Sequence, residues 1–535
     1  MRPARVLALL LFLHLITFAQ SQPAPSRYAA VLDRLQSITT VPLEKWSAHD
    51  ANLPHGEDSA LDVSQWQTVA MNQAWEPAPR WLRTTFEVPA RWNGYRVDGT
   101  RLQLVFSVGS SSELGYTVFS NGNMVFRGTN DNLVPITLTE AAIPGQKFVI
   151  AIRVLETGGV DCCGEPDTKL ITSQIEIQPP ASRPDPSVLR LQILSAETLV
   201  AAYPDNKSQR QSQLDAAVKT IEPGALDRGD QMAFDNSLRA AQTKLEALRP
   251  YMRQFKIAAV GNSHIDMAWL WPETETVEVV RDTFGTALDL MREYPNFKFT
   301  ASTAQAYTWM EEKYPEIFKE IQQRVKEGRW EVIGGMWVEP DLNMPDGESL
   351  VRQILYGKRY FQEKFGVDIK IGWNPDSFGY NWQLPQIYKR SGIDYFVTQK
   401  LMWAHEFTTF PYRFFNWQSP DGSKLLTYFP SDYANPIDPQ KMARDSANYG
   451  PMMWKYNGGS NSAPAGGLQM MYLYGVGDHG GGPTRNDLDT ALRWQKSDLV
   501  YPSLEFSTAA DYFAELKKNE SELNIPTWNG ELYFQ

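Results

Sequence analysis

The sequence predicts a multidomain protein, with an N-terminal β-sandwich, a short helical segment and a large α/β domain that resembles a β/α barrel. Three observations predict this class. The 535 residues exceed the usual size of one hydrophobic core. Runs of strand-like alternation come first, a helical period follows, and strands and helices then alternate. With 42% apolar and 21% charged residues, the composition is that of a folded protein.

The β-sandwich is predicted over residues 65–178. Six runs with strand patterning follow one another at short spacing, and turn residues separate them. The Asn-Gly pair at 121–122, set among alternating apolar residues, predicts a tight hairpin. The proline-rich stretch PPASRPDPS at 179–187 then marks a boundary.

Residues 186–253 are predicted to be helical, because their apolar positions lie three and four residues apart. The stretch EPGALDRGD at 222–230 breaks this segment into two helices. From 256 to 535 the predicted strands and helices alternate, which implies a parallel sheet or barrel. Reactive groups in such a domain belong at the carboxyl ends of the strands.

The first residues have the layout of a secretory signal peptide. Arg2 and Arg5 precede an apolar stretch from Val6 to about Ala19, and small and polar residues follow. The apolar stretch is shorter than the ~20 residues that a membrane span needs. We therefore expect a signal peptide over residues 1–21, a secreted or periplasmic protein, and no membrane span after cleavage.

Charge and cysteine content exclude two classes of protein. The net charge of −11 argues against binding nucleic acid, because phosphate binding requires a basic surface. The two cysteines, Cys162 and Cys163, are adjacent, and neighbouring cysteines rarely form a disulfide with each other. We expect two inert thiols and a fold that does not depend on disulfides.

Four loops that directly follow predicted strands carry acidic or histidine side chains. They contain His264 and Asp266, Glu339 and Asp341, Asp376, and Asp478 and His479. Residues two apart in extended backbone point to the same side, and imidazole with carboxylate is a ligand set that suits Zn²⁺. The residues alone leave other readings open, namely a hydrogen-bonded structural pair at 264 and 266 and a turn-capping Asp376. The glycines after His479 would let a ligand approach the backbone.

Five motifs give a specific resemblance. The stretches NSHIDMAWLWP, GGMWVEPDLNMPDGESLVRQ, GWNPDSFGYNWQLPQI, GDHGGGPT and WNGELYFQ occur in this order between about 256 and 535. Together they resemble the family 38 glycoside hydrolases, which are zinc-dependent α-mannosidases. The sandwich, expected to be galactose-binding-like, and the helices also resemble the N-terminal region of the cytosolic-type and bacterial branch.

The resemblance implies a role for each matched residue. His264, Asp266 and Asp376 would ligate Zn²⁺, and Asp376 would also be the nucleophile of a retaining hydrolase acting on terminal α-mannose of glycans. The metal would hold the 2- and 3-hydroxyls of the sugar. The residues expected to line the sugar pocket are Trp269, Trp337, Glu339, Asp341, Trp373, Asp478 and His479. The acid/base stays open between Asp432 and Asp438, with Asp478 a third candidate.

The chain departs from the family pattern after GELY, where the family continues into a histidine motif and this chain reaches Gln535. The resemblance therefore implies the front part of a longer enzyme, inactive by itself, with a fourth zinc ligand beyond Gln535. Two other functions are kept as alternatives. One is a zinc-dependent deacetylase or phosphoesterase on a β/α barrel, and the other is a non-catalytic carbohydrate-binding protein that uses the sandwich.

Overall fold

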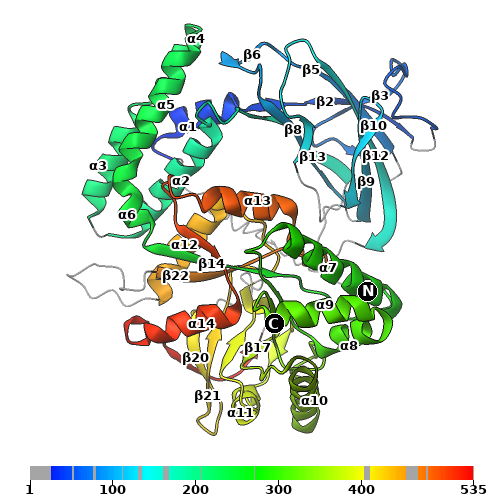
Figure 1. Cartoon of the computed structure of the whole chain (residues 1–535), viewed down its shortest axis with the longest axis vertical. Coiled ribbons are helices and arrows are strands. Elements are labelled where there is room, and N and C mark those ends of the chain that lie inside the picture. The colour runs from blue at the N-terminus through cyan, green and yellow to red at the C-terminus, as the bar shows by residue number, and fades with distance from the viewer. Residues whose placement is uncertain are drawn as a thin grey trace, which may run out of the picture.

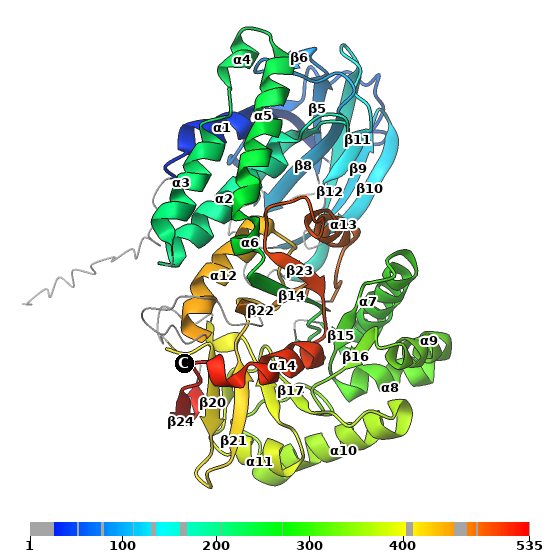
Figure 2. The same ribbon diagram turned by 60° about the vertical axis from the view of Figure 1, so that its left-hand side comes forward.

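The computed structural model describes residues 26–50, 53–75, 80–110, 112–129, 135–160, 168–204, 206–269, 271–402, 410–453, 468–477 and 480–533. The sandwich and the helical segment lie side by side at one end of the molecule, and the α/β part fills the other end (Figures 1 and 2). The multidomain class that the sequence predicts is confirmed.

The N-terminal part is built from two antiparallel sheets and a small hairpin. Its strands are β1 (Thr40–Pro42), β2 (Lys45–Asp50), β3 (Gln67–Ala70), β4 (Ala74–Trp75), β5 (Arg80–Glu87), β8 (Arg101–Gly109), β9 (Ser112–Ser120), β10 (Asn123–Thr129), β11 (Ile136–Thr139), β12 (Lys147–Val160) and β13 (Thr168–Gln178), with β6 (Arg91–Trp92) and β7 (Tyr95–Arg96) as the hairpin. One sheet has the order β1-β13-β8-β11, with β4 paired to β13, and the other has the order β10-β9-β12-β5-β2-β3.

Alternation explains how the two sheets pack. Successive side chains point to opposite faces, so β8 buries Leu102, Leu104 and Phe106 on one face. Trp46 of β2 joins the same core, and its indole N–H donates to the Ser173 hydroxyl of β13 in the other sheet at 3.0 Å. The sandwich thus has one shared core between its two sheets.

Two details of the sandwich bear on the sequence predictions. The hairpin at 121–122 is present between β9 and β10, and both Asn121 and Gly122 have positive φ, as the tight turn requires. The sheets also begin earlier than residue 65, because β1 and β2 pair with β13 and β5. These two strands are short and carry few consecutive apolar residues, so their pattern is weak.

The helical segment contains more helices than the sequence predicts. It consists of α2 (Pro186–Ala202), α3 (Lys207–Val218), α4 (Gly224–Asp227), α5 (Gln231–Leu245), η2 (Glu246–Leu248) and α6 (Arg249–Met252), and α1 (Ala29–Ser37) packs beside α2. Helix α3 was not expected as a separate element. Its sequence is mostly polar and only Leu214, Ala217 and Val218 are buried, so it has little apolar period.

The first sheet of the α/β part is entirely parallel. Its strands are β14 (Phe255–Asn262), β15 (Phe299–Ala301), β16 (Trp330–Val332), β22 (Leu468–Tyr474) and β23 (Ser503–Phe506), in the order β16-β15-β14-β22 with β23 also paired to β14. The helices that connect and follow these strands are α7 (Glu273–Glu293), α8 (Ala304–Lys313), α9 (Pro315–Lys326), α10 (Gly347–Phe365), α13 (Arg485–Trp494), α14 (Ala509–Lys518) and η4 (Glu520–Glu522).

The second sheet is mixed. It contains β17 (Ile371–Trp373), β19 (Tyr395–Val397), β21 (Lys424–Tyr428), β20 (Phe414–Gln418) and β24 (Thr527–Asn529) in that order, and β20 runs antiparallel to β21. Around it lie α11 (Leu384–Arg390), η3 (Lys400–Met402) and a two-stranded pair of β18 (Gly379–Tyr380) and β25 (Leu532–Tyr533). Helix α12 (Pro439–Met453) packs instead against α2 and against β22 of the first sheet.

The sequence predicts a parallel sheet or a barrel-like arrangement, and the strands of the α/β part lie in two sheets. The facing edges β16 and β17 approach each other, and the Gly334 N–H donates to the Ile371 carbonyl at 3.0 Å. No further ladder closes the sheets into one barrel in the described part of the chain. Parallel strand ends from both sheets nevertheless point to a common region.

The stretch AYTWMEEKYPEIFKEIQQRVKEG at 306–328, one of the helices predicted between 256 and 535, forms two helices. Pro315 is the first residue of α9, and Tyr314 before it has non-helical φ and ψ of −134° and 61°. A proline disfavours helical backbone at the residue that precedes it, so the chain turns there.

A search of the described helices finds none that is both long and apolar enough to cross a membrane. The predicted signal peptide lies in residues 1–25, outside the described residues, and so do Cys162 and Cys163.

Glu331 joins β16 to α14. Its buried carboxylate accepts hydrogen bonds from the backbone N–H groups of Ala509 at 2.9 Å and Ala510 at 2.8 Å, and from the Thr300 hydroxyl at 2.8 Å. A carboxylate at the first turn of a helix satisfies N–H groups that have no partner within the helix. Burial is the main influence on this group and raises the pKa of the Glu331 carboxyl.

We expect Glu331→Ala to lower the free energy of unfolding by about 2 kcal/mol, because the buried Ala509 N–H and the buried Thr300 hydroxyl lose their acceptor. Urea denaturation followed by tryptophan fluorescence measures the change. Glu363→Ala, at an exposed position of α10, is the matched control and should leave the transition midpoint unchanged. Equal midpoints for the two variants would contradict this account of α14.

Candidate active site

Side chains from several strand ends meet between the two sheets of the α/β part. His264 and Asp266 follow β14, Glu339 follows β16, Asp376 follows β17, and Lys400 follows β19. Each strand runs parallel to its neighbour in its own sheet, so these loops leave the sheets on one side. This is the location that the strand-end rule predicts.

The structure brings the three predicted metal ligands together. Ligand atoms of His264, Asp266 and Asp376 all lie within 4.8 Å of one another. Among the described residues, no second group of three or more His, Cys, Asp or Glu side chains is arranged in this way. One nitrogen and two carboxylate oxygens at this spacing can hold a divalent cation such as Zn²⁺.

Glu339 connects two members of this cluster. One oxygen, Oε2, lies 3.0 Å from Nε2 of His264, and the other, Oε1, accepts the backbone N–H of Asp376 at 2.8 Å. The sequence prediction placed Glu339 in the sugar pocket. In the structure its carboxylate contacts the histidine ring and the Asp376 loop, and its predicted part in sugar binding stays a prediction.

The electrostatics of His264 favour a cation at this point. The ring is 6% exposed. Burial lowers its pKa, but the nearby carboxylates, above all Glu339 and then Asp266 and Asp376, outweigh burial and raise the pKa to about 9. A cluster that stabilises a proton on a buried imidazole also stabilises a metal ion in the place of that proton.

The hydrogen bonds of His264 also fit a metal ligand. Its Nδ1 is buried and has no hydrogen-bond partner, whereas Nε2 pairs with Glu339. A histidine that binds a metal through one nitrogen usually donates from the other to a carboxylate. The residues present therefore fit a metal site, and the unsatisfied nitrogen is the observation that supports the fit.

Lys400 is a site residue that the sequence analysis missed. Its side chain is buried and its Nζ donates to Oδ1 of Asp376 at 2.6 Å. The same Nζ lies 4.2 Å from the centre of the Phe378 ring. Burial raises the pKa of the Asp376 carboxyl, and the charges of His264 and Lys400 oppose this shift. The position of Lys400 directly after the strand DYFVTQ was the available signal, because the strand-end rule applies to lysine as well.

The glycines after β22 serve packing within the chain. A Cβ at Gly475 would lie 2.3 Å from the carbonyl oxygen of Asn262, and one at Gly480 would lie 2.4 Å from the Val279 side chain. Both residues also have positive φ. The glycines after His479 are expected to admit a ligand, and that role stays a prediction. In the structure Gly475 lets the loop lie against the segment that carries His264, and Gly480 leaves room for Val279 of α7.

A family model now decides the classification. The model of the glycosyl hydrolases family 38 N-terminal domain matches residues 254–531. The chain belongs to family 38 of the glycoside hydrolases. The resemblance seen in the sequence motifs is confirmed, and membership favours a glycosidase over the deacetylase alternative.

Relatives of family 38 agree with this assignment. Alpha-mannosidase G of Dictyostelium discoideum is 39% identical over 308 residues, which cover 57% of this chain and 27% of that protein. Alpha-mannosidase 2C1 of Homo sapiens is 38% identical over 284 residues, covering 53% and 26%. The solved structure of an alpha-mannosidase from Enterococcus faecalis V583 is 21% identical, covers 52% of this chain and 31% of that chain, and has a TM-score of 0.42. The chain spans about a quarter of the length of the two curated relatives.

The predicted sugar-pocket residues of the family 38 domain lie in different surroundings. Trp269 is exposed beside Trp271. Trp337 is half-buried and its indole N–H donates to Gln305 at 3.0 Å. Trp373 is 3% exposed and lies in the hydrophobic core, so little of its ring is open to a ligand.

Three further predicted residues lie on loops. The carboxylate of Asp341 is exposed and accepts the backbone N–H groups of Asn343 and Met344, both at 2.8 Å, which makes it a turn residue. Asp478 and His479 lie outside the described residues, and their predicted part in substrate binding stays a prediction.

The two acid/base candidates, Asp432 and Asp438, have different surroundings in the structure. Asp432 precedes Tyr433, whose ring centre is 4.9 Å from that of His264. Asp438 accepts the backbone N–H of Lys441 at 2.8 Å at the start of α12 and lines a cavity against the sandwich. The surroundings of Asp432 therefore fit a catalytic position better than those of Asp438, which acts as a helix cap.

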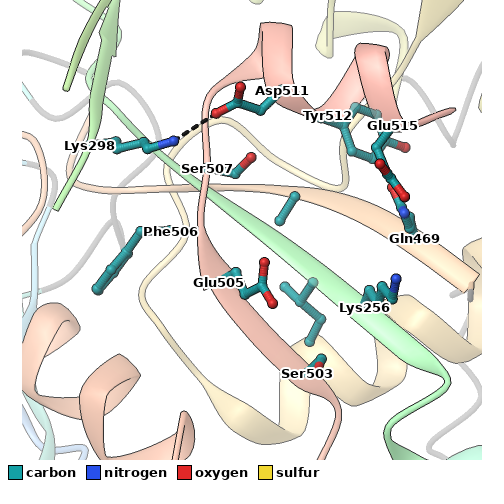
Figure 3. A pocket seen from close by; sticks show the side chains of 12 residues that line it. Lys256, Lys298, Gln469, Ser503, Glu505, Phe506, Ser507, Asp511, Tyr512 and Glu515 are labelled. Carbon is teal, nitrogen blue, oxygen red and sulfur yellow. Dashed lines mark hydrogen bonds and ion pairs between the residues drawn. The ribbon is translucent and has the colours of Figure 1, made fainter. Parts of the chain in front are cut away.

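A separate cavity of about 410 Å³ lies at the opposite end of β14 (Figure 3). It is lined by Lys256 of β14, Glu505 of β23 and Asp511 of α14 among others, and Lys298 pairs with Asp511 at 2.7 Å. None of the predicted site residues lines it. The strands begin at this end of the sheet, so the cavity is distinct from the cluster around His264.

The cluster predicts metal binding by the isolated chain. We expect one divalent transition-metal ion per chain, and loss of that ion in His264→Ala and Asp266→Asn, because each variant removes one of three ligands. Isothermal titration calorimetry with Zn²⁺, Co²⁺ and Mn²⁺ measures stoichiometry and affinity. Asp346→Asn, at the exposed N-cap of α10, is the matched control. Equal affinities for the control and the two ligand variants would contradict the assignment.

Proposed function

We propose that this chain carries the catalytic domain of an exported, zinc-dependent, retaining α-mannosidase that removes terminal α-mannosyl residues from glycans. One observation carries the proposal, namely that His264, Asp266 and Asp376 cluster within 4.8 Å in a chain of family 38. The relatives named alpha-mannosidase support the substrate class. The pattern of residues 1–21 supports export to a secreted or periplasmic location.

Zn²⁺ would be held by His264, Asp266 and Asp376, and when bound it would supply positive charge that orients sugar hydroxyls. Other residues of the chain orient these ligands. Glu339 fixes the ring of His264 and the backbone of Asp376 by its two oxygens. Carboxylates around a metal-binding histidine tune and orient the ligand, so Glu339 is a positioning residue in this proposal.

Asp376 is proposed as the nucleophile. Its carboxylate attacks the anomeric carbon of mannose, the bond to the leaving oxygen breaks, and a mannosyl ester forms on Asp376. A water molecule then attacks the same carbon and releases Asp376, with net retention of configuration. Lys400 supports the first step, because its ammonium group at 2.6 Å stabilises the ionised and oriented form of the carboxylate.

Asp432 is proposed as the acid that protonates the leaving oxygen and then deprotonates the attacking water. It follows β21, whose carboxyl end lies on the same side as the ends of β17 and β19. Its neighbour Tyr433 contacts the His264 ring. Asp478 stays the alternative acid, because it follows β22 at another strand end. It lies outside the described residues.

The proposal predicts metal-dependent cleavage of α-mannosides. The protein made from its natural gene should hydrolyse p-nitrophenyl α-mannoside, lose that activity on chelation and regain it with Zn²⁺. Asp376→Asn should lower kcat by about 10³-fold or more, because the amide is a poor nucleophile. Asp346→Asn is the matched control with unchanged kcat.

Two outcomes would overturn this function. One is hydrolysis that survives complete metal removal. The other is an Asp376→Asn variant that keeps most of its rate. Glycan binding without hydrolysis by the natural protein would instead favour the non-catalytic carbohydrate-binding alternative.

Lys400 gives an independent prediction. Lys400→Met should lower kcat by about 10²-fold, because a preorganised charge next to the nucleophile is lost. Lys400→Arg should recover much of the rate, since a cation returns to the same place. Steady-state kinetics on p-nitrophenyl α-mannoside compares the two, with circular dichroism as a folding check. Equal loss in both variants, with both folded, would contradict the role assigned to the charge.

A further inference from the structure

A second polar cavity lies between the sandwich and the family 38 domain. It has a volume of about 590 Å³ and is bordered by one sandwich sheet, by α2, by α13 and by the loop before α12. In both views α13 lies next to the sandwich (Figures 1 and 2). Its size falls within the roughly 300–1,000 Å³ of small-molecule sites.

The sandwich wall of this cavity is a row of polar side chains that crosses four adjacent strands. Thr40 of β1 pairs with Glu176 of β13, Glu176 pairs with Gln103 of β8, and Gln103 pairs with Thr137 of β11. All four line the cavity. Because alternate residues of each strand point into the sandwich core, this row is the outer face of the sheet.

The family 38 domain covers this polar face instead of leaving it to water. Gln103 is only 8% exposed, although it lies on the outer face of the sheet. Its amide makes one long hydrogen bond, donating to the Thr137 hydroxyl at 3.4 Å. The Gln174 amide donates to Glu176, also at 3.4 Å. Part of the lining is already paired, since Arg101 donates to the Thr137 hydroxyl at 2.9 Å and Arg190 donates to Gln36 at 2.8 Å. The contacts of the Gln103 and Gln174 amides are long, so these two groups keep hydrogen-bonding capacity for a ligand.

Charge on the two walls is nearly balanced. The lining residues that carry charge are Arg101, Arg190, Arg485 and Arg493 against Glu176, Asp438 and Asp489. Two of the arginines already pair with acids, Arg485 with Glu293 at 2.6 Å and Arg101 with Glu140 at 3.2 Å. A phosphate or a polyamine would meet little net opposite charge, so the lining favours a neutral polar ligand.

The mixture of groups matches a sugar. Glutamine amides both donate and accept, carboxylates accept, guanidinium groups donate, and threonine hydroxyls do either. A sugar presents hydroxyls that both donate and accept on neighbouring carbons, so it can satisfy such a set without bringing charge.

We propose that this interdomain cavity is a second carbohydrate site, which binds a neutral oligosaccharide between the sandwich and the family 38 domain. The site is separate from the cluster around His264, since none of the cluster residues lines it. The choice of a mannose oligosaccharide as its ligand rests on the proposed function. The site itself rests on the polar row and the balanced charge.

The test measures oligosaccharide binding by a variant whose cluster around His264 has lost its histidine. Isothermal titration calorimetry of α-linked mannotriose is carried out on the 535-residue chain carrying His264→Ala, with maltotriose and cellotriose as further probes. We expect saturable binding of mannotriose. Gln103→Met, on the sandwich wall, and Arg493→Met, on the opposite wall, should each weaken it by about tenfold, because each removes hydrogen bonds to the ligand.

Gln67→Met is the matched control, since Gln67 is an exposed glutamine of β3 in the other sheet. It should change the affinity less than twofold, and all variants should share one thermal midpoint. Absence of binding by all three probes, or equal affinities of Gln103→Met and Gln67→Met, would overturn the site. Binding of maltotriose or cellotriose alone, weakened by Gln103→Met, would keep the site and remove its mannose ligand, whatever the natural enzyme hydrolyses.

Discussion

The α/β part depends on one electrostatic constraint: three carboxylates surround a buried imidazole between two sheets. Glu339, Asp266 and Asp376 raise the pKa of His264 to about 9 against the effect of burial. Uncompensated negative charge in such a place is costly, so the cluster requires a cation. Lys400 supplies one positive charge at Asp376, and a divalent ion held by His264, Asp266 and Asp376 would supply the rest.

The backbone around the cluster is packed closely and is held by the cluster's own side chains. The glycine-rich loop after β22 lies against the segment of His264, and Gly475 could not carry a side chain there. Glu339 holds both the imidazole and the Asp376 loop, so it couples the first sheet to the second. The two sheets are joined at one edge by the Gly334 to Ile371 hydrogen bond, and near β21 and β22 by the bridge between Asn435 and Tyr474. The cluster is a further link between them.

Much of this arrangement could be predicted from the sequence, for identifiable reasons. Strong alternation and long apolar periods predicted β8, β12, α7 and α10. The strand-end rule placed the loops of His264, Asp266 and Asp376 at strand ends, and the family resemblance grouped the three as ligands. Weak or polar patterns hid β1, β2 and α3, and a proline divided the helix expected over 306–328. Sequence also could not reveal that Glu339 bridges two ligands or that Lys400 contacts Asp376, because these contacts join loops from different strands.

The interface between the sandwich and the family 38 domain contains a second polar region, apart from the cluster around His264. A sheet face that would ordinarily meet water is covered at a polar cavity. Under the two proposals made above, glycan binding at this cavity is separate from bond cleavage at the cluster around His264. An enzyme built in this way can hold an oligosaccharide at one point and process a terminal residue at another.

The most direct test of the central claim is zinc K-edge X-ray absorption on the zinc-loaded chain. The account predicts one zinc ion with nitrogen and oxygen ligands at about 2.0–2.2 Å, including outer-shell scattering from one imidazole. His264→Ala should remove the imidazole signal. A spectrum of hydrated zinc that is the same in parent and variant would contradict the claim that His264, Asp266 and Asp376 share one ion.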